Sequence, residues 1–214
     1  MISNRYRSIN YPDVAHRAPP RFISWRGHQL LEEATVSTAT PVKASATRPA
    51  KSEFLPYYER YISLVPDGDV ISTLIGQMAE TQSLLRALPA SVATYRYAPD
   101  KWSVNEVVGH MIDSERIFAG RALRFGRNDA QPIPGFEQDD YVRNANFDAY
   151  PLSELASEME TVRQSTLYLF RHMDEEAWTR RGIANNAEVS VRALAYIIAG
   201  HELHHLDVLR TRYL

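Results

Sequence analysis

The sequence predicts an all-α fold: a four-helix bundle with a long crossover between helices two and three, preceded by a disordered N-terminal tail. Four stretches repeat apolar residues at helical spacing, strand signals are weak throughout, and one connection is much longer than the others. Residues 1–50 show no sustained apolar period, so they are unlikely to join a packed core. We therefore expect a disordered extension over residues 1–51 and a folded domain over residues 52–214. An Arg-rich, acid-poor start is also compatible with a transit peptide, although a plain tail is the favoured interpretation.

Three of the helices have recognisable limits. The first is expected at about residues 69–88, because Pro89 ends it. Its apolar face comprises Ile71, Leu74, Ile75, Met78 and Leu85. The third helix follows Pro151. Its aligned apolar residues are Leu152, Leu155, Met159, Val162, Leu169 and Met173. The fourth is expected over residues 191–213, with Ser190 as its N-cap.

The second helix has the clearest beginning. Ser103 and Glu106 have the spacing of a capping box, and Trp102 and Val107 have that of a hydrophobic staple, although Trp102 could also line a pocket. The apolar stripe that follows includes Val104, Val108, Met111, Phe118, Ala122 and Phe125. This pattern predicts an amphipathic helix with one face in the core of the bundle.

The connection between the second and third helices is unusually long. It runs over about residues 127–150 and contains Pro132, Pro134 and Gly135. Antiparallel neighbours in a bundle are usually joined by about 2–8 residues. A longer connection suits a crossover that returns along the bundle, which would make the second and third helices parallel. Such a loop is also a natural wall for a site.

Composition narrows the classes of function. Apolar residues make up 44% of the chain, charged residues make up 23%, and the formal net charge is -2. This composition is globular and gives no reason to expect nucleic acid or an anionic membrane as a partner. The absence of cysteine excludes disulfides, thiolate ligands and a cysteine nucleophile. No apolar run predicts a membrane span or a signal peptide, so a cytoplasmic protein is expected.

A pair of histidines in the fourth helix predicts a metal site. His201 and His205 are four residues apart, so they share one helical face and can hold one divalent ion. With Glu202 they also match the H-E-x-x-H pattern of zinc peptidases. Those enzymes take a third ligand from downstream, but only nine residues follow His205 and none is His or Glu. We therefore expect an upstream third ligand and consider a peptidase the weakest of the functional hypotheses.

His110 is the candidate for that ligand. It lies in the second helix at the edge of the apolar stripe, where a lone histidine is usually a core residue. With His201 and His205 facing the same core, metal ligation becomes the favoured reading. His172, near the end of the third helix, is expected to be solvated or to cap that helix. Three imidazoles would leave a position open for water or substrate. Zinc is the expected metal, and nickel, iron or manganese could use the same ligands.

Two segments carry a resemblance to a known family. Residues 97–116 read YAPDKWSVNEVVGHMIDSER, and residues 200–206 read GHELHHL. Both resemble signatures of the DinB-like superfamily, damage-inducible-type metalloproteins built on a four-helix bundle. The resemblance covers about residues 52–214. It implies His110, His201 and His205 as metal ligands, and parallel second and third helices.

The resemblance also bears on function. Members include transferases and isomerases that use bacillithiol, mycothiol or glutathione, while many others have no assigned reaction. It therefore implies a small-molecule substrate, allows a low-molecular-weight thiol as co-substrate, and makes a homodimer conceivable. The site is implied more firmly than the substrate.

Two carboxylates near the proposed metal have open roles. Glu202 could orient a ligand imidazole or take a proton from metal-bound water, and an ion pair with an arginine of a neighbouring helix is weighed equally. Asp113, one turn after His110, could be a hydrogen-bond acceptor for that imidazole, and a solvated position is favoured slightly over this role. Glu202 and Asp113 are therefore candidate catalytic residues.

Other polar side chains of these helices have structural explanations. Glu115 falls within the apolar stripe of the second helix, so a buried pair with an arginine is expected. His204 is expected at the edge of the site. A solvated face rather than an anion site is expected for Arg116, Arg121, Arg124 and Arg127.

The sequence thus predicts a divalent-metal-binding protein that is a metal-dependent transferase or hydrolase. A metal held by three histidines lowers the pKa of a bound water or thiol, which supports hydrolysis or transfer of a thiol to an electrophile. The alternative is a non-enzymatic, stress-associated protein that binds a metal or a small ligand.

Overall fold

The computed structural model describes residues 47–214. Most of the predicted N-terminal extension, residues 1–46, lies outside the described residues. The part that is described contacts the domain, because Arg48 donates hydrogen bonds to the carbonyl oxygens of Ile62 (2.7 Å) and Val65 (2.6 Å).

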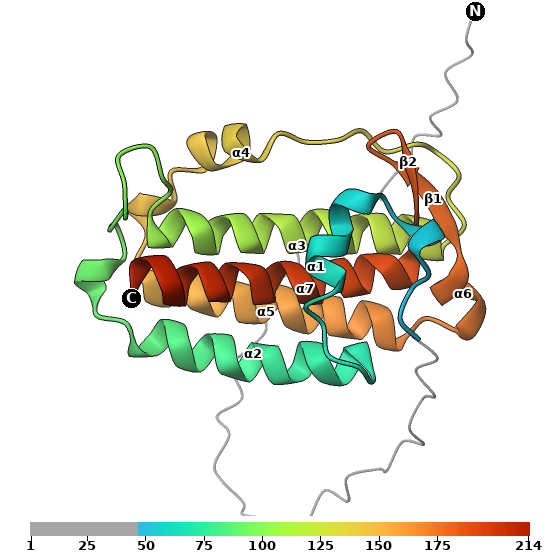
Figure 1. The fold of residues 1–214 in the computed structure, drawn as a ribbon, viewed down its shortest axis with the longest axis horizontal. Coiled ribbons are helices and arrows are strands. Elements are labelled where there is room, and N and C mark those ends of the chain that lie inside the picture. The colour runs from blue at the N-terminus through green and yellow to red at the C-terminus, as the bar shows by residue number, and fades with distance from the viewer. Residues whose placement is uncertain (1–46) are drawn as a thin grey trace, which may run out of the picture. The chain divides into compact units, whose positions relative to one another are not determined.

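Four long helices form the predicted bundle (Figure 1). They are α2 (Val70–Ala87), α3 (Val104–Gly126), α5 (Leu152–Arg171) and α7 (Val191–Val208), and a π-helical turn (Leu209–Tyr213) extends the last of them. In Figure 1, α3 and α5 run in the same direction, and α2 and α7 run opposite to them. The connection after α3 returns along the bundle and carries the short helix α4 (Gln138–Ala145). The predicted crossover and the parallel second and third helices are confirmed.

Side-chain caps are present at the helix starts, including the two predicted at Ser103 and Ser190. The Ser103 hydroxyl accepts a hydrogen bond from the Glu106 backbone N–H (3.0 Å), and the Glu106 carboxylate accepts one from the Ser103 N–H (2.8 Å). Asp69 caps α2 and Ser190 caps α7 through their side chains. Each cap satisfies backbone N–H groups that have no partner within the helix.

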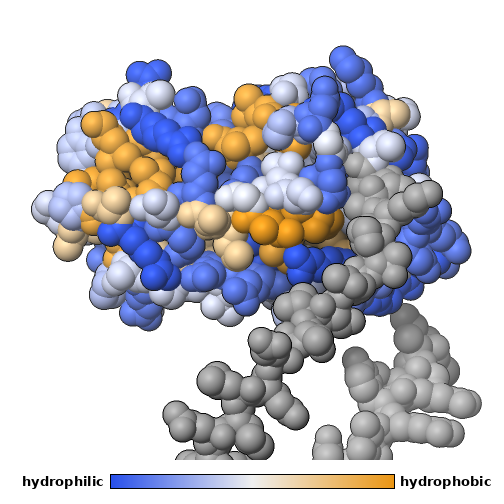
Figure 2. Space-filling model, turned by 90° about the horizontal axis from the view of Figure 1, so that it is seen from below, coloured by the Kyte–Doolittle hydropathy of each residue, from blue (hydrophilic) through white to orange (hydrophobic). Residues whose placement is uncertain are grey.

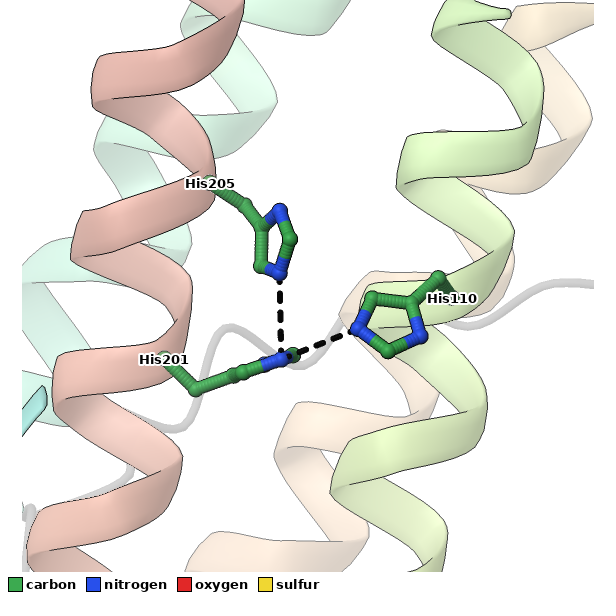
Figure 3. A group of neighbouring side chains, drawn as sticks. All are labelled: His110, His201 and His205. Carbon is green, nitrogen blue, oxygen red and sulfur yellow. Dashed lines mark hydrogen bonds between the residues drawn. The ribbon is translucent and has the colours of Figure 1, made fainter. Parts of the chain in front are cut away.

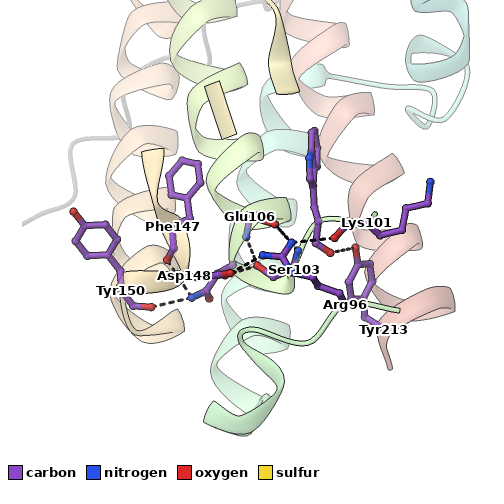
Figure 4. A network of polar contacts seen from close by, with 10 residues as sticks. Arg96, Lys101, Ser103, Glu106, Phe147, Asp148, Tyr150 and Tyr213 are labelled. Carbon is purple, nitrogen blue, oxygen red and sulfur yellow. Dashed lines mark hydrogen bonds and ion pairs between the residues drawn. The ribbon is translucent and has the colours of Figure 1, made fainter. Parts of the chain in front are cut away.

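A polar network holds the end of the crossover against the start of α3 (Figure 4). Arg96 forms ion pairs with Glu106 and, at 2.7 Å, with Asp148 of the crossover. The Ser103 hydroxyl also donates a hydrogen bond to Asp148, and the Asn105 side chain donates to two carbonyl groups of the same segment. The capping box of α3 is therefore also an anchor for the crossover.

The face that α2 buries differs in part from the predicted one. Ile75 is 38% exposed and Met78 is only partly buried, whereas Gln77 is buried and donates a hydrogen bond to the carbonyl oxygen of Ala199 (2.8 Å). Hydrophobic patches are visible between hydrophilic side chains when the molecule is seen from below (Figure 2). The apolar period therefore located α2 correctly but assigned Ile75 to the buried face, where Gln77 lies instead because α7 supplies a polar partner for it.

A β-hairpin is present where strand signals are weak. Strands β1 (Arg181–Ala184) and β2 (Ala187–Ser190) pair antiparallel, and the crossover joins them through an isolated bridge between Ile133 and Ala184. The two residues of the turn, Asn185 and Asn186, have φ values of 52° and 60°. Positive φ at both positions is typical of a type I′ turn, which asparagine tolerates. Four-residue strands are too short for a clear alternating pattern.

The domain also contains two short helices that the periodicity did not predict. Helix α1 (Glu59–Ile62) lies against α7, and helix α6 (Glu175–Thr179) leads into the hairpin. The buried apolar residues form two clusters. One includes the C-terminal half of α3 and the N-terminal half of α7, and the other includes the N-terminal half of α3 and the C-terminal end of α7. Within residues 47–214, no helix has the length and apolar character needed to cross a membrane.

Candidate metal centre

Three histidines from two helices meet in the interior of the bundle (Figure 3). His110 belongs to α3, and His201 and His205 belong to α7. The Nε2 atom of His201 lies 3.0 Å from Nε2 of His110 and 3.1 Å from Nε2 of His205. One ligand atom from each of the three lies within 4.8 Å of the others. The structure therefore brings together the three side chains that the sequence singled out.

The donor set fits one divalent ion. Two imidazole nitrogens bound to a tetrahedral zinc ion lie about 3.3 Å apart, close to the separations seen here. Burial lowers the pKa of His110 to about 4, and His204 adds to this effect. Burial and the neighbouring imidazoles also lower the pKa of His201 and of His205. Neutral imidazoles have the free lone pair that a metal requires.

The surroundings of the histidines hold two of the rings in place. The Ser114 hydroxyl lies 3.5 Å from Nδ1 of His110, one turn along α3. The ring centroids of Trp102 and His110 are 4.8 Å apart, and those of Tyr61 and His201 are 5.3 Å apart. Nδ1 of His205 is buried and has no hydrogen-bond partner among the described residues. Trp102, which the sequence predicted as a staple or a pocket residue, thus contacts His110.

The other two histidines of the domain have the positions predicted for them. His204 is half-buried beside the site, with its ring 5.4 Å from that of Tyr61. His172 is exposed at the end of α5. Neither belongs to the group of ligand atoms that converge.

A glycine precedes a converging histidine on each helix, and each allows a close contact. A Cβ atom on Gly200 would lie 2.0 Å from the carbonyl oxygen of Tyr61, and one on Gly109 would lie 2.4 Å from the Phe147 ring. The absence of a side chain therefore lets α1 approach α7 beside His201. The absence of a side chain at Gly109 also lets the crossover approach α3 beside His110. Sequence reasoning missed this role, although both glycines stand within the motifs.

Glu202 forms an ion pair with an arginine of a neighbouring helix, which is one of the two roles predicted for it. Its carboxylate accepts hydrogen bonds from Arg163 of α5 (2.7 Å) and from the Thr81 hydroxyl of α2. Arg163 also binds both oxygens of Glu115, at 2.8 Å and 2.7 Å. Burial raises the pKa of Glu202, while Arg163 and Thr81 oppose that effect. Glu115 therefore has the buried arginine partner that was expected, and each oxygen of Glu202 accepts a hydrogen bond from a neighbouring helix.

Asp113 lies at the side of the site. Its carboxylate is 3.7 Å from the guanidinium of Arg116, which also pairs with Glu158 of α5 at 2.7 Å. Partial burial raises the pKa of Asp113, and Arg116 opposes this. The nearest polar neighbour found for Nδ1 of His110 is Ser114 rather than Asp113. The carboxylate is thus placed in a surface ion-pair chain between α3 and α5.

A pocket of about 450 Å³ opens onto the histidines. His110, Ser114 and His201 form part of its lining, together with the crossover and the hairpin turn at Asn185. Aromatic side chains line much of the remainder: Tyr57, Tyr58, Tyr61, Phe118 and Phe136. A volume of this size suits a small organic molecule. The long crossover is a wall of this pocket, as its length predicted.

Arg121 corrects one expectation about the arginines of α3. It is only 4% exposed and lines the same pocket, whereas Arg127 is exposed as expected. The expectation of a solvated side chain is wrong for Arg121, because the crossover covers this part of α3 and accepts its hydrogen bond at the Pro134 carbonyl (3.3 Å). The local sequence of α3 contains no sign of that cover.

A family model described as the DinB superfamily matches residues 74–209, a range that contains all three converging histidines. A search of curated protein sequences returns no significant match.

Solved structures with a similar fold include YfiT from Bacillus subtilis, described as a probable metal-dependent hydrolase with an unusual four-helix bundle topology. It is 13% identical, with a TM-score of 0.55, over 76% of this chain and 91% of that one. A mycothiol-dependent maleylpyruvate isomerase is 11% identical, with a TM-score of 0.55, over 68% of this chain and 62% of the isomerase. At these identities the similarity shows a shared fold.

Proposed function

The chain belongs to the DinB superfamily, and on that premise we propose that it is a metal-dependent enzyme acting on a small molecule. In this proposal His110, His201 and His205 hold one divalent ion. The observation that carries it is the meeting of three imidazoles from α3 and α7 beside a pocket of about 450 Å³. Structural zinc sites usually have four protein ligands, whereas three leave a position open for chemistry.

The proposed chemistry is hydrolysis, or transfer of a thiol to an electrophilic substrate. A divalent ion bound here would supply Lewis acidity and lower the pKa of a coordinated water or thiol. The chain has no cysteine, so a thiol would have to come from a small co-substrate. A structural neighbour is described as mycothiol-dependent, which supports a test of such thiols. Zinc is the first candidate metal, followed by nickel, iron and manganese.

Glu202 and Asp113 enter the proposal as positioning residues. Glu202 joins α7 to α2 and α5 directly beside His201, because Thr81 and Arg163 both donate to its carboxylate. Asp113 takes part in the ion pairs that join α3 to α5. Within residues 47–214, no hydrogen bond joins either carboxylate to His110, His201 or His205. This arrangement also argues against an H-E-x-x-H peptidase, in which the glutamate must act on metal-bound water.

Metal content tests the site directly. Elemental mass spectrometry on the purified wild type should find about one equivalent of a divalent metal per chain. His110→Ala should hold little, whereas His172→Ala, which changes an exposed histidine of the same domain, should hold as much as the wild type. Full retention by His110→Ala would remove α3 from the site, and a metal-free wild type after reconstitution would overturn the proposal.

A second candidate function is binding without turnover. The metal-loaded protein can be screened with bacillithiol, mycothiol and glutathione, each combined with electrophilic acceptors, and separately with ester substrates. Turnover that is lost in His110→Ala supports the enzyme. Metal binding without any turnover across these panels would favour the non-enzymatic, stress-associated protein.

A further inference from the structure

Arg121 is a buried cation whose charge is not balanced by a carboxylate. Its guanidinium donates a hydrogen bond to the Pro134 carbonyl and interacts with the Tyr58 hydroxyl, while Nε is buried without a hydrogen-bond partner among the described residues. No carboxylate in residues 47–214 forms an ion pair with it within 4.0 Å. A buried charge with neither a counter-ion nor a full set of hydrogen bonds is destabilising. The position therefore requires an explanation beyond packing.

The neighbours of the guanidinium do not neutralise it. Tyr58 lies beside Arg121, but burial raises the pKa of the Tyr58 phenol and the arginine offsets this only in part, so the hydroxyl stays neutral near neutral pH. The Phe118 and Phe136 rings lie 5.6 Å and 5.9 Å from its Cζ atom. Such contacts stabilise a cation modestly and leave its charge in place.

Arg121 and the histidines line one pocket. His110, Ser114, Phe118 and Arg121 follow one face of α3, about 16 Å of helix from first to last. The guanidinium is 5.6 Å from the Phe118 ring, and that ring is 6.2 Å from the His201 ring. A molecule bound at Arg121 would thus extend over Phe118 towards the histidines.

We propose that Arg121 binds a carboxylate group of the substrate, and that the pocket takes small acids with an apolar or aromatic body. This inference rests on the proposed function, since it takes the pocket beside the histidines as the substrate site. A single guanidinium matches a monoanion, and its planar donors suit a carboxylate. The aromatic lining at Tyr58, Phe118 and Phe136 supplies apolar contact for the rest of the molecule.

Two acids of the pocket are compatible with this assignment. Glu137 and Asp139 line it but are exposed, so water screens their charge. Neither forms an ion pair with Arg121.

Benzoate and benzamide are suitable probes, because they share a shape and differ in charge. Calorimetric titration of the purified protein should show that benzoate binds at least about tenfold more tightly than benzamide. Arg121→Met should remove this preference, and Arg121→Lys should retain part of it. Arg127→Met, which changes an exposed arginine at the end of the same helix, should bind both probes as the wild type does. The titration is repeated after chelation, so that a carboxylate bound by the metal is recognised.

The outcomes separate this inference from the proposed function. Equal binding of the two probes by the wild type, or an unchanged preference in Arg121→Met, would overturn it. Equal weakening of both probes would show that Arg121 only supports the crossover, which also overturns it. Metal content is measured in every sample. A wild type without metal that still prefers benzoate through Arg121 would retain the anion site and refute the metal-dependent function.

Discussion

The Nε2 atoms of His110 and His201 lie 3.0 Å apart, although 91 positions separate the two residues in the chain. The contact depends on α3 and α7 lying side by side in the bundle, with His205 one turn further along α7. Because the two helices contribute to one cluster, an ion bound there would join distant parts of the fold. Metal binding should therefore be measurable as stability as well as content.

Removal of the metal should lower the melting temperature of the wild type. A ligand that binds only the folded chain stabilises it by about 2.7 kcal/mol when its free concentration is a hundredfold above Kd. Differential scanning calorimetry with and without chelator should show this loss in the wild type and in His204→Ala, and no loss in His110→Ala. A chelator effect that disappears in His204→Ala but persists in His110→Ala would assign the ligands differently.

The buried charges around Arg163 should be sensitive to the loss of that arginine. Arg163→Met would leave the carboxylates of Glu115 and Glu202 without their shared cation, which should cost about 3–5 kcal/mol of folding free energy. Urea unfolding measures this, with Arg171→Met, an exposed position on α5, as the control that should change stability by less than about 0.5 kcal/mol. Similar stabilities for the two variants would show that Arg163 is not energetically coupled to Glu115 and Glu202. Adding Glu115→Gln to Arg163→Met should recover part of the loss.

Gly200 and Gly76 should respond to alanine in opposite directions. A Cβ atom on Gly200 would meet the Tyr61 backbone at 2.0 Å, whereas one on Gly76 has no other atom within 4 Å. Gly200→Ala should therefore destabilise the protein by about 1–3 kcal/mol as α1 is displaced from α7. Gly76→Ala, at an exposed position in α2, should stabilise it by about 0.5–1 kcal/mol. Chemical unfolding of both variants checks this, and a stabilising Gly200→Ala would contradict the close contact.

Glu53 should make part of the stability depend on pH. Burial raises the pKa of its carboxyl, but hydrogen bonds from Arg192, the Ala50 N–H and Ser190 outweigh burial and hold the pKa below its usual value near 4.5. The folded chain therefore releases this proton more readily than the unfolded chain. The resulting stabilisation is complete above the unfolded pKa and is lost as pH falls through the folded pKa.

Glu53→Gln isolates this contribution. Urea midpoints should show that the variant is less stable than the wild type near pH 7, where the carboxylate is ionised in both states. The difference between the two proteins should shrink as the pH falls below about 4.5. A difference that is constant across this range would mean that Glu53 acts only through packing.

Local patterns along the chain were sufficient to predict the four long helices. Apolar residues at helical spacing, the capping box at Ser103 and the prolines that border helices lie within a few residues of the elements they specify. The same local information placed His201 and His205 on one face, and the length of the segment after α3 predicted its return along the bundle. Metal ligation by the three histidines stays a prediction until metal content is measured.

Tertiary structure decided the partners of the polar side chains. The periodicity of α3 showed that Glu115 would be buried, but only the packing of α5 identified Arg163 as its partner. In the same way, the sequence allowed two roles for Glu202. Only the tertiary structure showed that α2 and α5 supply hydrogen-bond donors for both of its oxygens. The sequence predicted a solvated Arg121, whereas the crossover buries it. Helical spacing is a property of neighbouring residues, whereas the partner of a buried charge depends on which distant segment packs against it.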